Sequence, residues 1–232
     1  MCGRYTLTKP APWLLEILGG EPAGELLPRY NIAPGQEVPI VRASPAGACE
    51  LALARWGLVP PWAQDPSLGT RAINARSETA AQKPAFRAAL RRRRCLLPAD
   101  GFYEWAREGG RKRPYFISLR DGAPFAFAGL WEAWSAPGGS ALESCAILTT
   151  EANERLRAIH PRMPVILPRQ AHGLWLDSTA EDPERLLPLL RPWPAEETAA
   201  RPVSLRVNDV RNDDPACLAP PESPRQASLF GP

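Results

Sequence analysis

The sequence predicts an α+β fold in which a mixed or antiparallel β-sheet carries peripheral helices. Short segments of alternating apolar and polar residues recur along the chain, and turn residues rather than regularly spaced helices separate them. The 28 prolines favour loops over long helices. A chain of 232 residues with 44% hydrophobic residues is long enough to bury a sizeable core. Neither a repeat nor a linker interrupts residues 1–218, so we expect one domain.

One helix and two strands are expected in the first part of the chain. The helix covers 10–20, where the apolar residues fall on one face and Gly19 provides a stop. The segment 28–37 is expected to be a loop that leads into a strand at 38–42. A second strand over 50–56 ends in a turn rich in tryptophan and proline.

The polar segment 73–80 is expected to be irregular, and a helix is expected over 84–95. Pro84 suits the first turn of that helix, because the proline lacks an N–H that would be unpaired there in any case. Four consecutive arginines, Arg91 to Arg94, lie at its C-terminal end, where they complement the helix dipole. This structural role is the favoured explanation of the arginine run.

The second half of the chain is expected to form mostly strands. An apolar strand, an Asp100–Gly101 turn and an aromatic strand occupy 95–105. Two alternating segments within 115–134 flank Asp121–Gly122, which predicts a β-hairpin. A strand, a short helix, a loop followed by a strand, and a helix capped by Asp182 are then expected in turn at 144–150, 153–159, 160–167 and 182–190.

Composition excludes several classes of protein. No apolar run approaches the ~20 residues that span a bilayer, and the N-terminus lacks the regions of a signal peptide, so we expect a cytoplasmic protein. The 5 cysteines form no CxxC pair, and the 2 histidines leave no zinc-ligand spacing, so neither a metal nor an organic cofactor is expected. The net charge is +3, and almost every base is arginine, whose planar fork suits phosphate. Arginine-rich composition can also reflect nucleotide composition and is weak evidence for a nucleic-acid partner.

The position of Cys2 has a specific chemical consequence. Removal of Met1 leaves an α-amine beside a thiol, and this 1,2-aminothiol can capture an aldehyde twice, first as a Schiff base and then as a thiazolidine ring. The alternative is that Cys2 is a chance residue on a frayed terminus. Position alone favours the second interpretation.

Polar residues among apolar neighbours supply further candidates, each with a structural alternative. Glu104, between two aromatics on an expected strand, is either a surface carboxylate or a partly desolvated proton-transfer group. His160 is either a satisfied loop histidine or an acid–base group. Asn74 either makes local backbone bonds or orients a nucleophile.

Cations and aromatics give a second set of candidates. Arg4, Arg76 and Arg162 are either solvated charges or phosphate clamps. Trp62 and Trp105 belong either to the core or to platforms on which unstacked bases lie.

Taken together, these stretches resemble one family, the SOS-response-associated peptidase (SRAP) domain proteins, which process abasic sites in single-stranded DNA. The matching words run in order along the chain and are MCGRYTL (1–7), PRYNIAPGQ (28–36), RWGLVPPWA (55–63), INARSET (73–79), RCLLPADGFYEW (94–105), FAFAGLWE (125–132), TTEAN (149–153), HPRMPVIL (160–167) and VSLRVNDVRNDDPACLAP (203–220).

The resemblance implies a catalytic role for Cys2. Its α-amine attacks C1′ of the ring-opened abasic sugar, and its thiol then closes a stable thiazolidine crosslink. Asn74 positions Cys2, Glu104 moves protons during ring opening and imine formation, and His160 assists proton transfer at the sugar oxygen and the Schiff base. Arg4, Arg76 and Arg162 contact phosphates, while Trp62 and Trp105 line the DNA groove.

The resemblance also carries implications for the whole molecule. It implies one SRAP domain over 1–220, with a sheet curled into a barrel-like core and a positively charged DNA groove, followed by a disordered tail at 221–232. The expected partner is single-stranded DNA with abasic sites, including single-strand/duplex junctions, and the DNA-bound protein would lie at the nucleoid. A monomer is expected, with neither metal, cofactor nor membrane involved.

Other activities stay open on the sequence. An N-terminal-nucleophile peptidase, at least one that removes its own Met1, can use Cys2, Glu104 and His160. An abasic-site lyase would cut the strand by β-elimination from the Schiff base. A non-catalytic DNA-binding protein would need the tryptophans and arginines but has no use for a cysteine at position 2.

Overall fold

The computed structural model describes residues 2–9, 12–18, 26–44, 47–136 and 138–222. Its centre is a closed, mixed β-barrel with the strand order β10-β4-β3-β6-β9, in which β9 pairs back onto β10. The β10–β4 pairing is parallel and the others are antiparallel. The barrel strands are β3 (Glu37–Ala43), β4 (Cys49–Trp56), β6 (Arg94–Ala99), β9 (Phe125–Ser135) and β10 (Ala141–Glu151).

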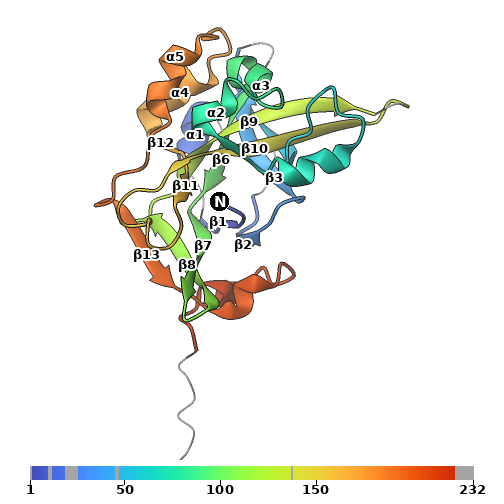
Figure 1. The fold of residues 1–232 in the computed structure, drawn as a ribbon. Helices are drawn as coiled ribbons and strands as arrows, with labels where there is room; N and C mark the ends of the chain where they lie inside the picture. The colour runs from blue at the N-terminus through green and yellow to red at the C-terminus, as the bar shows by residue number, and fades with distance from the viewer. Residues whose placement is uncertain (1, 10–11, 19–25, 45–46, 137, 223–232) are drawn as a thin grey trace, which may run out of the picture.

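Short strands extend the barrel sheet. Both β5 (Asn74–Arg76) and β11 (Arg162–Pro164) pair with β10, whereas β12 (Ile166–Leu167) pairs with β9. A second sheet has the order β13-β8-β7-β1-β2 and lies below the barrel in Figure 1. Its strands are β1 (Tyr5–Leu7), β2 (Arg29–Ile32), β7 (Gly101–Glu108), β8 (Arg111–Leu119) and β13 (Thr198–Pro202).

The described helices are all short and peripheral, and none of them is long and apolar enough to cross a membrane. The α-helices are α1 (Pro12–Leu18), α2 (Ser77–Ala80), α3 (Arg87–Arg92), α4 (His172–Leu176) and α5 (Pro183–Leu186). The 3₁₀ helices are η1 (Pro66–Arg71), η2 (Arg169–Ala171), η3 (Leu187–Leu189), η4 (Leu205–Asn208) and η5 (Pro215–Leu218). The expected α+β architecture with a barrel-like core is therefore confirmed.

Alternate residues of the barrel strands pack in two directions. One set packs with the helices, where Trp175 of α4 is fully buried. The other set packs against the second sheet, where Tyr5 lies edge-on to Trp56 with ring centroids 5.3 Å apart. Phe127 joins them, with its centroid 5.7 Å from that of Tyr5. These aromatic contacts attach β1, and with it the N-terminal residues, to the barrel.

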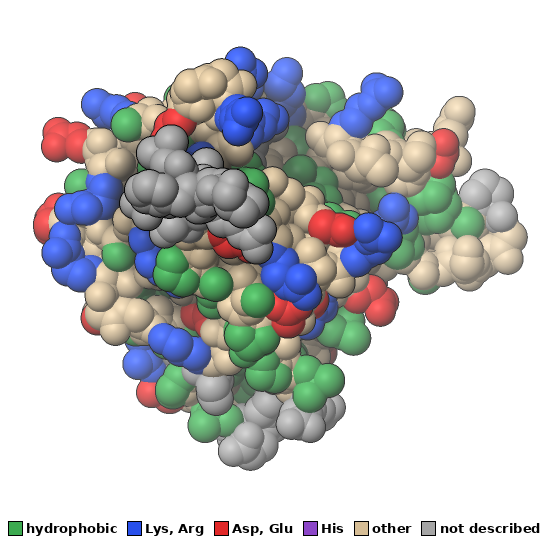
Figure 2. Space-filling model, turned by 90° about the horizontal axis from the view of Figure 1, so that it is seen from below, with side chains coloured by type: hydrophobic (Ala, Val, Ile, Leu, Met, Phe, Trp, Pro, Cys, Tyr) green, Lys and Arg blue, Asp and Glu red, His purple; other side chains and the backbone are tan. Residues whose placement is uncertain are grey.

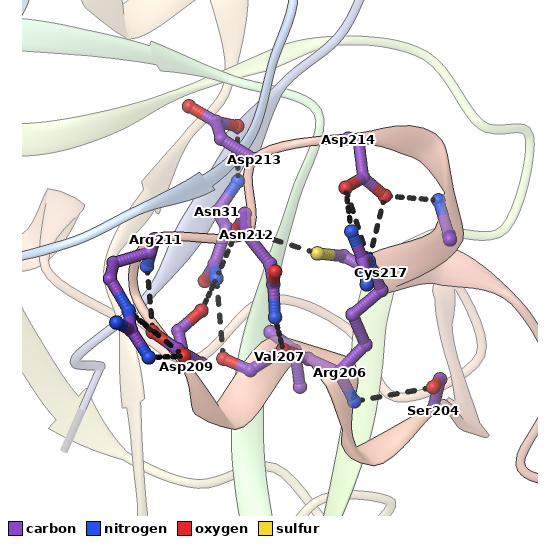
Figure 3. A network of polar contacts seen from close by, with 11 residues as sticks. Asn31, Ser204, Arg206, Val207, Asp209, Arg211, Asn212, Asp213, Asp214 and Cys217 are labelled. Carbon is purple, nitrogen blue, oxygen red and sulfur yellow. Dashed lines mark hydrogen bonds and ion pairs between the residues drawn. The ribbon is translucent and has the colours of Figure 1, made fainter.

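A second attachment comes from the other end of the chain. We call residues 204–218 the C-terminal strap; η4 and η5 lie within it. Figure 3 shows that the buried Asn31 of β2 donates to the carbonyls of Val207, Asp209 and Asn212. Asp213 in return accepts hydrogen bonds from the backbone N–H groups of residues 30 and 31. The strap is thus held to β2 by two sets of bonds: the Asn31 side chain binds the strap backbone, and the Asp213 side chain binds the backbone of β2.

The hairpin predicted within 115–134 is wrong. Gly122 has a φ of 69°, so the turn itself is present. However, β8 pairs with β7 and β13, whereas β9 pairs with β6, β10 and β12. The turn therefore connects the two sheets, because each flanking segment finds a better partner elsewhere in the chain.

Other differences are local. The segment expected to be irregular forms β5 and α2, and the loop expected at 28–37 contains β2 and the start of β3. Residues 153–159 form hydrogen-bonded turns rather than a helix. Pro84 precedes α3, which begins at Arg87. Expected ends of the helix at 10–20 and most of the tail at 221–232 lie outside the described residues.

The arginine run has mixed roles. Arg91 and Arg92 lie in the last turn of α3, as the dipole argument predicts. Arg93 pairs with the buried Glu132 at 2.7 Å. Arg94 is buried in β6 and donates to backbone carbonyls, including that of Trp175 at 2.6 Å. The last two arginines therefore stabilise the interior contacts of α3 and α4 with the barrel.

Candidate active site

Cys2 is held where the two sheets meet. It precedes β1 in the second sheet and is fully buried. Asn74 Nδ2 donates to the Cys2 carbonyl at 2.8 Å, and Asn74 begins β5, which is paired with the barrel strand β10. The Cys2 Sγ lies 3.8 Å from the Arg4 carbonyl oxygen. The backbone at residue 2 is therefore fixed by a side chain of the barrel sheet.

The Cys2 thiol is in its neutral form. Burial, and after it the charge of the Glu104 carboxylate, raise the pKa of this thiol well above its ordinary value. A protonated thiol is a weak nucleophile, so its reaction needs a nearby group that accepts the proton. Glu104 is thus one of the charged groups that act on this thiol.

Glu104 and His160 form the other side of the site. Glu104 lies on β7 with 5% of its surface exposed, so the interpretation as a surface carboxylate is wrong. Its Oε1 is 3.9 Å from His160 Nδ1. His160 lies between β10 and β11, and its Nδ1 lies 3.0 Å from the backbone N–H of Arg162, which donates to it. A carboxylate and an imidazole thus lie close together where β7 meets the β10–β11 loop.

These groups open into a pocket of about 610 Å³, within the roughly 300–1,000 Å³ range of ligand sites. Its lining residues are Glu104, Trp105, Arg107, Lys112, His160 and Asn208. Trp105 is fixed at the edge of this pocket, because its Nε1 donates to Asn208 Oδ1 at 2.8 Å. The guanidinium of Arg4 lies 6.0 Å from the centre of the Trp105 ring.

The three predicted phosphate clamps have different environments. Arg4 Nη1 donates to Asn31 Oδ1 and to the Val207 carbonyl, at 2.8 and 2.6 Å. Arg162 makes a two-pronged ion pair with Glu78 and donates to the Thr149 carbonyl. Arg76 is exposed at the end of β5. Two of the three guanidinium groups are therefore engaged in bonds within the protein.

Trp62 lies apart from this cluster. It is 58% exposed and lines a second pocket with residues of η1, including Leu68 and Arg71. The structure thus brings Cys2, Asn74, Glu104, His160, Arg4 and Trp105 into one site by direct contacts and a shared pocket. Arg76 and Arg162 adjoin it through Asn74 and His160 in the sequence.

Sequence reasoning missed several residues of the site. Asn31 was interpreted as part of a loop, yet it is buried and bonds Arg4. Asn208, Arg107 and Lys112 had no assigned role and line the pocket. A signal for Asn208 was present, since it lies in the matching stretch 203–220, but nothing in the sequence places it beside Trp105.

Among the residues that the structure describes, no three His, Cys, Asp or Glu side chains are grouped to hold a metal ion. Figure 2 shows basic side chains interspersed with acidic ones on the face of the molecule seen from below. Together with a net charge of only +3, this distribution means that particular cations, rather than the overall field, decide where an anionic ligand would bind on this face.

The sequence and the structure were both compared with those of known proteins. The model of the SOS response associated peptidase (SRAP) family matches residues 1–210. The abasic site processing protein YoqW of Bacillus subtilis is 42% identical over 222 residues, which cover 94% of this chain and 99% of the relative. The abasic site processing protein HMCES of Gallus gallus is 36% identical, covering 86% of this chain and 68% of the relative. A crystal structure of a Bacteroides thetaiotaomicron protein matches with a TM-score of 0.84 at 26% identity, over 94% of this chain and 99% of that one.

Proposed function

Because the chain belongs to the SOS response associated peptidase (SRAP) family, we propose that it processes abasic sites in single-stranded DNA by forming a covalent bond through Cys2. The observation that carries this proposal is a buried Cys2 whose carbonyl is held by Asn74, together with a Glu104 carboxylate that acts on its thiol and lies 3.9 Å from His160. The relatives of similar length that are named abasic site processing proteins support the choice of lesion.

The reaction starts after Met1 has been removed and Cys2 carries a free α-amine. The ordinary pKa of such an amine is about 8, so a useful fraction is neutral near pH 7. The nitrogen adds to C1′ of the ring-opened sugar, and loss of one water leaves a Schiff base. The Cys2 sulfur then adds to the same carbon while its proton passes to the nitrogen. The products are a thiazolidine-linked adduct and one molecule of water.

Glu104 and His160 supply the proton transfers in this scheme. In this scheme Glu104 accepts the proton of the neutral thiol as sulfur attacks and passes it on to the nitrogen. His160, 3.9 Å from Glu104, protonates the oxygen that leaves as water. Asn74 donates a hydrogen bond to the Cys2 carbonyl and so orients the α-amine of Cys2 toward the sugar carbon.

DNA binding in this scheme uses the residues around the pocket. Trp105 offers a ring face on which a base can stack, and the exposed Trp62 offers another at the second pocket. Arg76 contacts a phosphate directly, whereas Arg4 and Arg162 add positive charge to the walls. Bases that stack on side chains must leave the duplex, so single strands and single-strand/duplex junctions are the preferred substrates.

The intact mass of the purified protein tests the proposal. The expected result is loss of Met1 and, after incubation with a single strand that carries one abasic site, a heat-stable gain equal to the oligonucleotide minus one water. A protein that keeps Met1, or that binds the strand without a covalent gain, contradicts it.

A matched pair of variants tests the proton transfer. Glu104→Gln preserves the shape but cannot accept a proton, and crosslinking is expected to slow by about a hundredfold or more. Glu108→Gln makes the same change on the same strand at an exposed position and should crosslink at the wild-type rate. Equal rates for the two variants would remove Glu104 from the mechanism.

Substitution of the nucleophile separates the crosslink from lyase and peptidase chemistry. Cys2→Ala, once trimmed, keeps an α-amine but lacks the thiol, so it forms a reversible Schiff base and can cut the strand by β-elimination. A Cys2→Ala adduct as heat-stable as that of the wild type would exclude the thiazolidine. Retention of Met1 in the variant Cys2→Ala would show that Cys2 takes part in its own exposure, which is the self-removal of Met1 that the peptidase alternative predicts.

A further inference from the structure

Two cations lie side by side on the ribbon formed by β7 and β8. Arg107 and Lys112 are directly opposite each other in the register of these antiparallel strands. The turn that fixes this register consists of Gly109 and Gly110, whose φ angles of 55° and 78° are those of a two-residue hairpin loop. Both side chains line the pocket that contains Glu104 and His160.

This arrangement is unfavourable for folding. Like charges directly opposite each other on a sheet repel and lower stability. The side chains of Arg107 and Lys112 have neither an ion-pair nor a hydrogen-bond partner among the residues that the structure describes. The acid next along the strand, Glu108, is already bonded to Arg113 and Tyr115. Both side chains are exposed, so an anionic ligand can reach them and relieve the repulsion.

The neighbours of the pair indicate the kind of anion. Trp105 shares the ribbon face of Arg107, two residues along the strand, and lines the same pocket. Asn208 holds the indole in place through its Nε1. Adjacent cations beside an ordered aromatic ring match a single nucleic-acid strand, in which phosphates alternate with bases that stack.

We propose that Arg107 and Lys112 form a phosphate subsite that binds the backbone of the DNA strand next to the abasic sugar, with Trp105 stacking on the adjoining base. This inference rests on the proposed function for the identity of the strand. Asn208 is a positioning residue in it, because it acts through Trp105.

The test measures binding of a labelled single strand that contains tetrahydrofuran in place of the abasic sugar. This probe cannot open to an aldehyde, so binding is recorded without crosslinking. Each of Arg107→Ala and Lys112→Ala is expected to weaken binding about fivefold and to reduce the salt dependence of log Kd by about 0.7. Arg107→Lys retains the charge and should retain the salt dependence.

Arg113→Ala is the matched control. It removes the same charge from the same ribbon, but that charge is already paired with Glu108 at 3.0 Å. Its salt dependence should equal that of the wild type. Three outcomes would each overturn the subsite. The first is a wild-type salt dependence in both pocket variants, and the second is an equal loss of salt dependence in the control. The third is that the wild type does not bind the probe.

The place of the phosphate is found with probes in which one linkage beside the lesion is a neutral methylphosphonate. At the linkage bound by the pair, neutralisation should abolish the difference between wild type and variants, as in a double-mutant cycle. Persistence of the full difference at every linkage near the lesion would overturn the subsite. Crosslinking of a natural abasic strand by the wild type is measured separately, so failure of the covalent chemistry is distinguished from failure of the subsite.

Discussion

At residue 2, a reactive side chain is combined with complete burial. The thiol is neutral because its surroundings and the Glu104 carboxylate disfavour the thiolate. A neutral thiol resists oxidation and alkylation, both of which require the thiolate and access to it. Cys2 is therefore protected from these side reactions in the folded protein.

Alkylation kinetics check this protection. At about pH 8.5, half of an ordinary cysteine is ionised, whereas the raised pKa keeps Cys2 protonated. Iodoacetamide should label native Cys2 at least about tenfold more slowly than Cys2 in urea, as followed by peptide mass analysis. Equal rates in the two conditions would show that the thiol is ionised and accessible.

Loss of the Asn74 amide is expected to affect the rate more than the fold. Asn74→Ala removes the bond to the Cys2 carbonyl, a net loss of about 1 kcal/mol for one hydrogen bond. Crosslinking at saturating DNA should slow by about tenfold, because the amine is no longer held in direction. Single-turnover kinetics and urea unfolding of the same variant measure the two effects; an unchanged crosslinking rate would contradict a positioning role.

Single residues show where prediction from the sequence succeeds. Strand alternation singled out Glu104, and its burial is observed. The resemblance named Asn74 and His160, which lie beside Cys2 and Glu104. Arg4 shows the limit, since its partner Val207 lies 203 positions away and no local pattern connects them.

At the scale of elements, the C-terminal strap contacts residues of the site and of β2. It bonds β2 through Asn31 and holds Trp105 through Asn208. The local sequence of residues 204–218 predicts neither contact. Its only regular structure is two short 3₁₀ helices. The order of the strap is imposed by buried hydrogen bonds.

Removal of Asn31 should release the strap. Asn31→Ala removes its bonds to three strap carbonyls and to the Arg4 guanidinium, although Arg4 keeps its bond to the Val207 carbonyl, and the loss is expected to cost about 2–3 kcal/mol. Hydrogen exchange within 204–218 should become faster than elsewhere. Asn212→Ala, which loses one exposed bond to the Arg206 carbonyl, is the control and should exchange like the wild type. Equal protection of the strap in both variants would contradict this.

The β8–β9 connection shows why element types are easier to predict than their partners. Alternation identified both strands, and Asp121–Gly122 identified the turn between them. The partner of each strand was set by tertiary packing, because β8 is held between β7 and β13 while β9 closes the barrel with β10. The residues of the turn do not determine which strands β8 and β9 pair with.

For the whole molecule, buried thiols predict instability in alkali. Burial raises the pKa of Cys2, Cys95 and Cys145 in the folded protein. In the unfolded chain these thiols ionise near pH 8.5, so unfolding releases protons and stability falls as the pH rises above that value. Three groups give a slope of up to about 4 kcal/mol per pH unit.

Urea unfolding between about pH 7 and pH 10 measures this slope. The variant Cys145→Ala should be less stable near neutrality, but its slope should be smaller by about 1.4 kcal/mol per pH unit. A constant free energy of unfolding across this range, or an unchanged slope in the variant, would show that these thiols do not control alkaline stability.

The bond between Arg4 and the Val207 carbonyl of the strap joins residues that lie 203 positions apart in the chain. While the chain is still being synthesised, Cys2 and Arg4 have left the ribosome but Val207 and Asn208 have not yet been made. The wall that holds Arg4 and Trp105 therefore forms late in biosynthesis, after the strap has been translated and has docked on β2. A nascent chain stalled before residue 204 carries Cys2 without a complete pocket around it.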